Sequence, residues 1–507
     1  MTPRKGRRVR FATAGLIVLV WLVSGIPVPA QESGTQPAGD SQTDKERIRA
    51  LEQPADKAAA QQSAVNEADR ARIRILEEEV ARLIAEIAAL QARMDEQGKS
   101  SRGVTIEELQ KQVEALTQEV ARLSAPAETP GGERQTYGGM SAGASRVYFA
   151  KKGLTFGGYG SGLFESFTSY NDNNTVTAEP NRADLTEAFF YVGYRFDDRF
   201  VFNSSLGIEH AVVEDGGNGK AAVEFAYLDY KVNEHIGARG GLVLMPIGFL
   251  NERHEPGDYL GARRPEVETR LLPSTWRELG GGVYGDAGPV QWRGYLVTSL
   301  DAAGFSPDTG VAGGRQQGSE AEATDLGWTA RVDWWVFKEK SFGTLVAGSS
   351  AFTGETGQRN PGFPPGRFSL WEMHADYRWK ALQARALWAR GIQSDAGELS
   401  LALDPSGNTA IGERMEGWYL EGGFNVLSWV PSTHQELIAF ARYEDVDTQE
   451  RVAPGMSADP ANDLTLKTIG LQYQPIPPIV IKLEAQNFDE RSHTKADQIN
   501  LGFGWSF

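Results

Sequence analysis

From Leu154 to Phe507, apolar and polar residues alternate with a period of two along most of the chain. In the last segment, Ile499, Leu501, Phe503, Trp505 and Phe507 alternate with Asn500, Gly502, Gly504 and Ser506. Successive side chains of a β-strand point to opposite faces, so this pattern predicts strands with one apolar and one polar face. No stretch of helical periodicity interrupts the region, and we expect it to be all-β.

Sixteen such segments are expected, and short turns alternate with longer polar loops between them. An even number of strands joined alternately by short and long connections is typical of a transmembrane antiparallel β-barrel. The predicted strands are 154–168, 181–197, 199–214, 220–233, 235–250, 275–287, 289–301, 323–338, 341–354, 367–378, 381–393, 413–428, 434–445, 463–475, 478–489 and 497–507.

A soluble β-sandwich or propeller is the alternative for this region. In the segment 323–338, Trp328, Val332 and Trp334 share one face, whereas Arg331 and Asp333 lie on the other. In water the aromatic face would have to be covered, and the charged face could not form the core. Lipid outside and water inside satisfy both faces, so we predict an outer-membrane β-barrel over residues 154–507.

The N-terminus has the layout of a secretory signal peptide. Basic residues at positions 4–10 precede an apolar run over 11–26, and Val28-Pro29-Ala30 supplies small residues before a polar chain. We therefore predict a signal peptide over 1–30 and export into the envelope of a Gram-negative-type bacterium, with a single-pass anchor as the alternative. Residues 31–70 are rich in Gln, Ala, Asp, Glu and Ser and are predicted to be a disordered linker.

Residues 71–124 carry a heptad pattern. From Ile73 to Met94, apolar residues recur at alternating steps of three and four, and the pattern resumes at Ile106 in a shifted register. A periplasmic coiled coil explains it. The segments either associate between chains or fold back through 97–105 as a hairpin, and a helix lying on the membrane is a third option. A glycine-rich connector is expected over 125–153.

Within that connector, residues 139–143 read Gly-Met-Ser-Ala-Gly and match the G-x-S-x-G pattern of hydrolases. That chemistry needs the serine on a strand-to-helix turn with a histidine and an acid nearby, which a glycine-rich connector does not predict. The six histidines show no i, i+4 metal spacing, and the chain has no cysteine. We therefore expect no catalytic residue, no metal and no cofactor, and do not expect an enzyme. The net charge of -16 argues against a nucleic-acid partner.

The longest predicted connection, Asn251–Ser274, follows the fifth strand and combines four arginines, five carboxylates and three prolines. A sixteen-strand barrel has a backbone diameter of roughly 32 Å, which side chains cannot fill. We predict that this loop folds inward and forms a pore constriction whose charges face water, with an exposed surface loop as the alternative. The predicted constriction residues are Arg253, His254, Glu255, Asp258, Arg263, Arg264, Glu266 and Arg270.

Strand parity also predicts which arginines face the lumen. Carboxylates interleave with them on the same faces, so pairing between neighbouring strands is an alternative to a role in permeation. The predicted pore-lining residues are Arg195, Arg239, Arg293, Arg331, Arg385 and Arg442.

The loop region carries a family resemblance. Met245-Pro246-Ile247-Gly248, Asn251-Glu252, His254-Glu255-Pro256, Arg264-Pro265 and Pro273–Glu278 resemble the fifth-strand and loop-three region of porins related to the phosphate-selective O and P type. The resemblance implies a sixteen-strand channel, a homotrimer in outer-membrane lipid, and a terminal aromatic, here Phe507, recognised by the barrel-assembly machinery.

The sequence and the resemblance together predict a water-filled porin for passive, ion-conducting transport of small hydrophilic or anionic solutes. Siderophore porins with a coiled-coil leader look similar, so a siderophore-type or other substrate-selective porin is one alternative. A structural envelope tether, whose coiled coil contacts the periplasm, is the other.

Overall fold

The computed structural model describes residues 135–213, 218–407, 410–430 and 433–507. All of them belong to one unit, Glu119–Phe507, defined by its internal contacts. The predicted signal peptide, linker and coiled coil, together with the start of the connector, lie outside the described residues.

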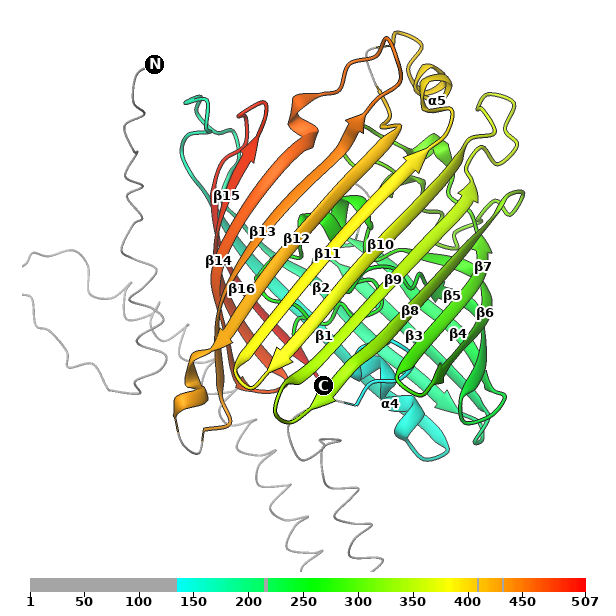
Figure 1. The fold of residues 1–507 in the computed structure, drawn as a ribbon, viewed down its shortest axis with the longest axis vertical. Coiled ribbons are helices and arrows are strands. Elements are labelled where there is room, and N and C mark those ends of the chain that lie inside the picture. Colours follow the sequence, from blue (N-terminus) through cyan, green and yellow to red (C-terminus); the bar gives the residue numbers. More distant parts are fainter. Residues whose placement is uncertain (1–134, 214–217, 408–409, 431–432) are drawn as a thin grey trace, which may run out of the picture. The chain divides into compact units, whose positions relative to one another are not determined.

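Sixteen strands form one closed antiparallel barrel, in which each strand pairs with its sequence neighbours and β1 pairs with β16 (Figure 1). This confirms the predicted fold class of the region. The strands are β1 (Gly153–Phe167), β2 (Arg182–Arg195), β3 (Phe200–Glu209), β4 (Lys220–Lys231), β5 (Ile236–Leu244), β6 (Arg277–Ala287), β7 (Val290–Thr298), β8 (Leu326–Glu339), β9 (Gly343–Glu355), β10 (Arg367–Trp379), β11 (Leu382–Gln393), β12 (Arg414–Asn425), β13 (Glu436–Arg451), β14 (Asp463–Ile476), β15 (Ile479–Glu490) and β16 (Gln498–Ser506).

The two faces of the strands differ as the alternation predicts. In β8, Trp328 and Val332 are 63% and 47% exposed, whereas Arg331 between them is 7% exposed. In β16, Leu501 is exposed and Asn500 is fully buried. Aliphatic and aromatic side chains thus cover the outside of the barrel, and the charged side chains of the strands point inward, the reverse of a water-soluble protein. Aromatic side chains such as Tyr159 and Phe225 are also buried inside, in one cluster with loop 3.

The connections alternate in length around the barrel. Turns such as Gly288-Pro289 join β6 to β7 at one end, and long loops join strands at the other, where the β11–β12 connection lies (Figure 1). The chain ends at the short-turn end, where the Phe507 N–H donates to the Gly158 carbonyl at 2.8 Å and the Phe507 carbonyl accepts from the Gly158 N–H at 3.0 Å. Phe507 therefore extends the seam between β16 and β1.

Two α-helices depart from the sequence prediction. Helix α4 (Ala142–Phe149) lies in the predicted connector, and helix α5 (Ala396–Leu403) lies in the β11–β12 loop, so the expectation that no helix follows Leu154 is wrong. Helix α5 is short and buries only Ala396, Leu399 and Ser400, which leaves too little of a periodic pattern to recognise. Among the described residues, no helix has both the length and the apolar character needed to cross a membrane.

Short helical turns complete the loops. A π-helical turn, Val267–Leu271, lies in the β5–β6 connection. The 3₁₀ turns are Ala302–Gly304, Ala312–Gly314, Val426–Trp429 and Pro460–Asn462.

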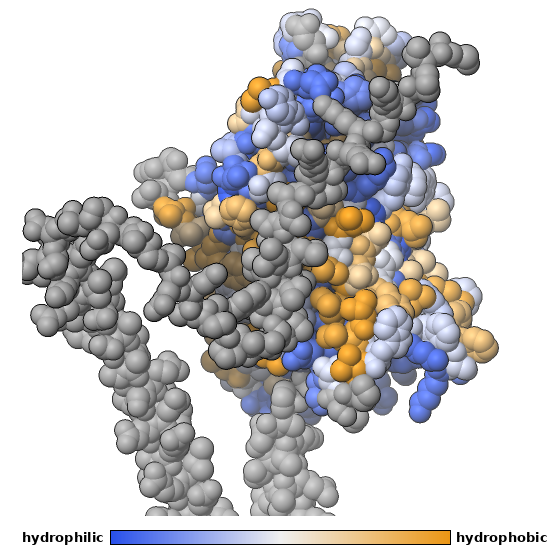
Figure 2. Space-filling view, turned by 90° about the vertical axis from the view of Figure 1, so that its left-hand side faces the viewer, coloured by the Kyte–Doolittle hydropathy of each residue, from blue (hydrophilic) through white to orange (hydrophobic). Residues whose placement is uncertain are grey.

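The outer surface separates into regions of different polarity. Figure 2 shows hydrophobic residues gathered across the middle and lower part of the visible face, with hydrophilic residues dominating its upper end. Strands around the whole barrel carry exposed apolar side chains, among them Phe156, Leu206, Val283, Met373, Leu420, Ile469 and Phe503. A contiguous apolar surface of this kind is stable against lipid and unfavourable against water.

Candidate functional site: the lumen of the barrel

The connection between β5 and β6, here called loop 3 (Met245–Trp276), folds into the barrel. Asn251 holds its two ends together: the side-chain amide donates to the Met245 carbonyl at 2.6 Å and to the Trp276 carbonyl at 2.7 Å, and its carbonyl oxygen accepts from the Trp276 N–H at 2.5 Å. Asn251 and Trp276 are both fully buried. Three residues of the distinctive sequence block thus meet at the base of the loop.

Basic side chains of the barrel wall bind the backbone of loop 3. Arg385 on β11 donates to the Asp258 carbonyl at 2.7 Å, Arg442 on β13 to the Leu260 carbonyl at 3.2 Å, and Lys482 on β15 to the Tyr259 carbonyl at 3.0 Å. Arg331 on β8 likewise donates to the Gly248 carbonyl. Loop carbonyls that would otherwise be buried without partners are satisfied in this way.

Acidic side chains of the wall bind basic groups and N–H groups of the loop. Glu484 on β15 accepts from the Ala262 N–H at 3.0 Å and the Arg263 N–H at 3.2 Å. Glu187 on β2 pairs with Arg264 at 3.0 Å, and Glu224 on β4 approaches His254 Nε2 at 3.1 Å. Loop 3 is therefore fixed to strands on opposite sides of the lumen.

An apolar cluster anchors the helical turn of the loop. Val267 and Leu271 are buried in the same hydrophobic core as Tyr419 of β12. Glu268 lies in this turn, where it accepts from the Tyr419 hydroxyl and from the Leu250 N–H, each at 2.7 Å. Burial raises the pKa of Glu268, and these two hydrogen bonds offset the effect only in part.

The predicted constriction residues all lie on this inward-folded loop, but their exposure differs from the expectation. His254 and Glu255 are each 1% exposed and Glu266 is 6% exposed, so the expectation that the loop charges all face water is wrong for them. Each has a partner that makes its burial tolerable: Glu224 of β4 for His254, the Gly143 N–H for Glu255, and Arg270 of the loop for Glu266.

The basic side chains of the loop are the more exposed ones. The Arg253 residue is exposed, and the side chain of Arg263 is 37% exposed although it pairs with Glu165 at 2.5 Å. Arg270 pairs with Glu266 at 2.7 Å and is 21% exposed. Desolvation of the Glu266 carboxyl is outweighed by Arg270 and Arg263, so its pKa is lowered and it stays charged.

His254 is a buried titratable group in the loop. Desolvation disfavours its charged form, but the attraction and the hydrogen bond of Glu224 outweigh desolvation and raise the pKa of His254.

The six predicted pore-lining arginines point inward, and each has a carboxylate partner. Arg239 pairs with Asp229 at 2.8 Å, and Arg331 with Asp333 at 2.8 Å. The remaining pairs are Arg195–Asp198, Arg293–Glu252, Arg385–Asp376 and Arg442–Glu444. Carboxylate pairing, in part between neighbouring strands as in the alternative reading, thus occurs at all six arginines. Four of them, Arg293, Arg331, Arg385 and Arg442, also contact loop 3.

A cavity of about 290 Å³ remains between loop 3 and the wall strands β1, β2, β15 and β16. Its polar lining is of mixed sign, with basic groups in the majority. The charged residues around it are Glu187, Arg263, Arg264, Glu266 and Lys482.

Sequence reasoning missed a second lumen element. Here the N-terminal segment denotes Tyr137–Phe149, which includes α4. Met140, Ser145 and Tyr148 in it are buried, and the Ser141 hydroxyl donates to the Asp258 carboxylate of loop 3 at 2.8 Å. The cluster of glycines and small residues at 139–143 was the available signal, because such residues allow close packing.

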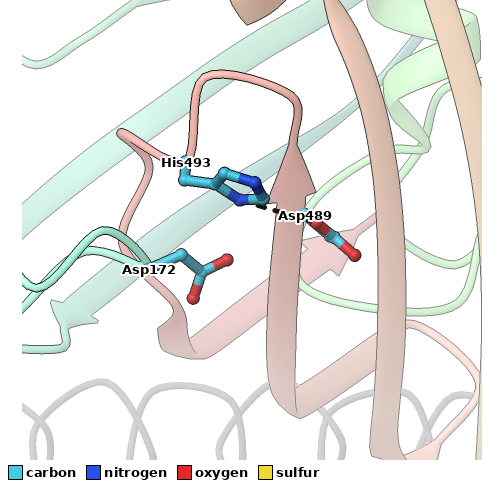
Figure 3. Close-up of side chains that lie close together, drawn as sticks. All are labelled: Asp172, Asp489 and His493. Carbon is cyan, nitrogen blue, oxygen red and sulfur yellow. Dashed lines mark ion pairs between the residues drawn. The ribbon is translucent and has the colours of Figure 1, made fainter. Parts of the chain in front are cut away.

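One further cluster lies at the long-loop end. Asp172 of the β1–β2 loop, Asp489 at the end of β15 and His493 of the β15–β16 loop come together (Figure 3), and their candidate ligand atoms lie within 4.8 Å of one another. His493 Nδ1 lies 3.9 Å from the Asp489 carboxylate. All three residues are exposed. Because water competes for exposed ligands, this geometry alone does not define a metal site.

No protein-family model matches the chain. Solved structures with a similar fold include a loop L8 deletion mutant of OmpT, an outer membrane protein of Vibrio cholerae, with 11% identity, a TM-score of 0.45 and coverage of 70% of this chain and 99% of that one. The outer membrane channel DcaP of Acinetobacter baumannii has 12% identity and a TM-score of 0.45, with coverage of 70% and 97%.

A sequence relative matches nearly three quarters of the chain. An uncharacterized protein of Aquifex aeolicus (strain VF5) is 33% identical over 379 residues, which cover 73% of this chain and 84% of the relative. The chain therefore belongs to the same family as this Aquifex aeolicus protein.

Proposed function

We propose that the protein is an outer-membrane porin, a water-filled channel for passive transport of small hydrophilic solutes, with loop 3 as its constriction. The observation that carries the proposal is the inverted barrel: its outer face is apolar and exposed, and its inner face holds a charged loop. Such a wall is stable in lipid, and a lumen of this polarity favours water and hydrophilic solutes.

We further propose a preference for anions that resides in loop 3. Among the charged side chains of the loop, Arg253 and Arg263 are the exposed ones, whereas Glu252, Glu255 and Glu268 are each no more than 3% exposed. Fields act over several ångströms inside a low-dielectric wall, so exposed guanidinium groups attract anions to the narrowest region.

Reversal potentials in a salt gradient across planar bilayers test the proposal. Neutralising Arg253 and Arg263 together with glutamine should shift selectivity towards cations, because the groups facing the lumen water are lost. As a matched control, Arg367→Gln removes an arginine at the long-loop end that pairs with Glu355 at 2.9 Å, and it should leave selectivity unchanged. Rim charges are screened within about 10 Å at 0.1 M salt. Equal selectivity in both variants would contradict the assignment to loop 3.

The same measurement separates the alternatives. An envelope tether predicts a purified protein that forms no conducting channel. A siderophore-type channel predicts conductance that a bulky chelate blocks and that phosphate leaves unaffected.

The proposed orientation places the short turns and the N-terminal side in the periplasm, and the proposed assembly is a trimer inserted by the barrel-assembly machinery through Phe507. Labelling of intact cells should reach cysteines placed near Gly313 and Ser406 but not one at Arg82. Surface labelling at Arg82 would contradict the orientation, and crosslinking that yields monomer alone would contradict the trimer.

A further inference from the structure

The N-terminal segment is bound to the inner wall of the barrel before the first strand begins. The Tyr148 hydroxyl donates to the Asp229 carboxylate of β4 at 2.5 Å. Asn203 of β3 donates to the Ala144 carbonyl at 2.8 Å, and Arg195 of β2 donates to the carbonyl of Ala150, which follows the helix, at 2.8 Å. Three neighbouring strands thus hold α4 at the short-turn end, where Figure 1 places it.

The other side of the same segment binds loop 3. The Ser141 hydroxyl donates to the Asp258 carboxylate at 2.8 Å, and the Gly143 N–H donates to the Glu255 carboxylate at 2.8 Å. In the reverse direction, Arg253 Nε donates to the Gly139 carbonyl at 3.2 Å. The contacts engage charged residues of both signs at the centre of the loop.

Two glycines make this approach possible. A Cβ atom on Gly143 would lie 2.6 Å from the Glu255 carboxylate and 2.7 Å from the Tyr191 ring. Gly139 has a φ of +86°, and a Cβ there would lie 2.6 Å from the Arg293 guanidinium. The small residues at 139–143, which match a hydrolase motif in sequence, thus allow this segment to pack closely against loop 3 and the barrel wall.

The docking also governs which charges of loop 3 face water. Asp258 and Glu255 receive hydrogen bonds from the segment, and Glu255 is 1% exposed. Arg253 donates only through Nε in this contact and remains an exposed residue. Removing the segment would take one donor from each of these two carboxylates and open them to the water of the lumen beside Arg253, with the Tyr191 hydroxyl still bound to Glu255 at 3.2 Å.

We propose that the N-terminal segment is a positioning element of the constriction: docked inside the barrel, it fixes the acidic side chains of loop 3 and narrows the short-turn half of the lumen. The inference rests on the channel function proposed above. It adds that the constriction has two parts, one from loop 3 and one from the chain that precedes the barrel.

The test uses the full chain, whose lack of cysteine allows a single reporter cysteine. Val147→Cys places a thiol on the buried side of α4, where Val147 is 1% exposed. In this background, Ser141→Ala removes one hydrogen bond and should raise the rate of maleimide labelling about fivefold, the factor that one net hydrogen bond represents. Gly143→Leu places a side chain where Glu255 now lies, which should displace the segment and raise the labelling rate further.

Bilayer recordings on the same variants supply the second readout. Gly143→Leu should increase single-channel conductance and shift the reversal potential towards cations, because the lumen widens and Glu255 and Asp258 gain access to water. Lys152→Gln, an exposed residue just beyond the helix, is the matched control and should change neither labelling nor conductance. Heat-dependent mobility on gels checks that each barrel is folded, and Tyr148→Phe replaces Gly143→Leu if that variant does not fold.

Three outcomes are distinguishable. Faster labelling together with altered conductance and selectivity supports the inference. Faster labelling with the parent's conductance and selectivity overturns it, as does unchanged labelling in every variant. A parent protein that forms no channel at all counts against the proposed function itself, whereas the labelling result still reports whether the segment is docked.

Discussion

At the scale of single residues, Asn251 shows how one buried side chain can fix a whole loop. One buried side chain joins the start and the end of loop 3 through three hydrogen bonds. Replacing it by alanine takes the partner of the buried Trp276 N–H, which costs about 1–3 kcal/mol. The Met245 and Trp276 carbonyls lose one hydrogen bond each but still accept from the Ile247 N–H and the Met245 N–H.

Asn251→Ala should therefore free loop 3 while the barrel persists. We expect faster amide hydrogen exchange and proteolytic cleavage within 251–274, with strand amides still protected. Asn360→Ala is the control, because Asn360 is exposed and its side chain accepts a hydrogen bond from the Gly362 N–H of its own loop at 3.0 Å. Equal exchange in loop 3 of both variants would contradict the clamp.

The His254 side chain gives a prediction of pH dependence. Since its pKa is raised in the folded protein, the attraction to Glu224 stabilises the docked loop fully below about pH 6.5, the unperturbed value, and is lost as pH rises through the raised pKa. NMR titration of labelled histidine should find the raised pKa, and Glu224→Gln should lower it. An unshifted titration in the parent would show that the two groups do not interact.

At the scale of elements, the strands were predictable from sequence, whereas the contacts inside the lumen were not. In β8 and β16, the alternation of apolar and polar residues predicted the strand ends to within a few residues and predicted which side chains face outward. It could do so because lipid favours apolar side chains on one face and the lumen favours polar ones on the other. In β13 the strand runs on to Arg451, past the predicted end at 445, since polar residues from Asp447 onwards hide the alternation. Inward-folded segments carry no such period.

The candidate site shows the same division. The inward folding of loop 3 followed from its length and charge, but the partners of its residues did not. Arg442 donates to the Leu260 carbonyl of loop 3, a contact that joins residues far apart in the chain. The docking of α4 was missed because Gly139 and Gly143 look like linker glycines unless the surfaces they approach are known.

The pairing of Arg442 leads to a prediction about the wall. Arg442→Gln leaves Glu421 and Glu444 buried without their cation, and breaking a buried pair in this way costs about 3–5 kcal/mol. We expect a lower temperature for conversion to the unfolded gel species. The combined variant Glu421→Gln/Glu444→Gln/Arg442→Gln should recover part of the lost thermal stability, because no unpaired charge remains. If the conversion temperature did not recover, the destabilisation would come from lost packing and not from unpaired charge.

At the scale of the whole molecule, the inverted distribution of side chains makes a test of membrane embedding. Val332 is 47% exposed near the middle of β8. Val332→Arg should cost about 2–4 kcal/mol of folding free energy in lipid vesicles, whereas Glu339→Arg, an exposed residue at the strand end, should cost about 0–1 kcal/mol. In a soluble barrel the substitution at Val332 would be neutral, and that result would contradict the membrane assignment.

The path of loop 3 across the barrel has a mechanical consequence. Its hydrogen bonds and ion pairs reach Glu187 of β2, Arg331 of β8 and Lys482 of β15, strands that lie around much of the circumference. A hollow tube resists bending of its wall poorly, and lateral pressure in a bilayer tends to flatten it into an ellipse. A loop bonded to several strands of the inner wall resists this flattening. The cross-section of the channel therefore keeps its shape while the surrounding lipid fluctuates.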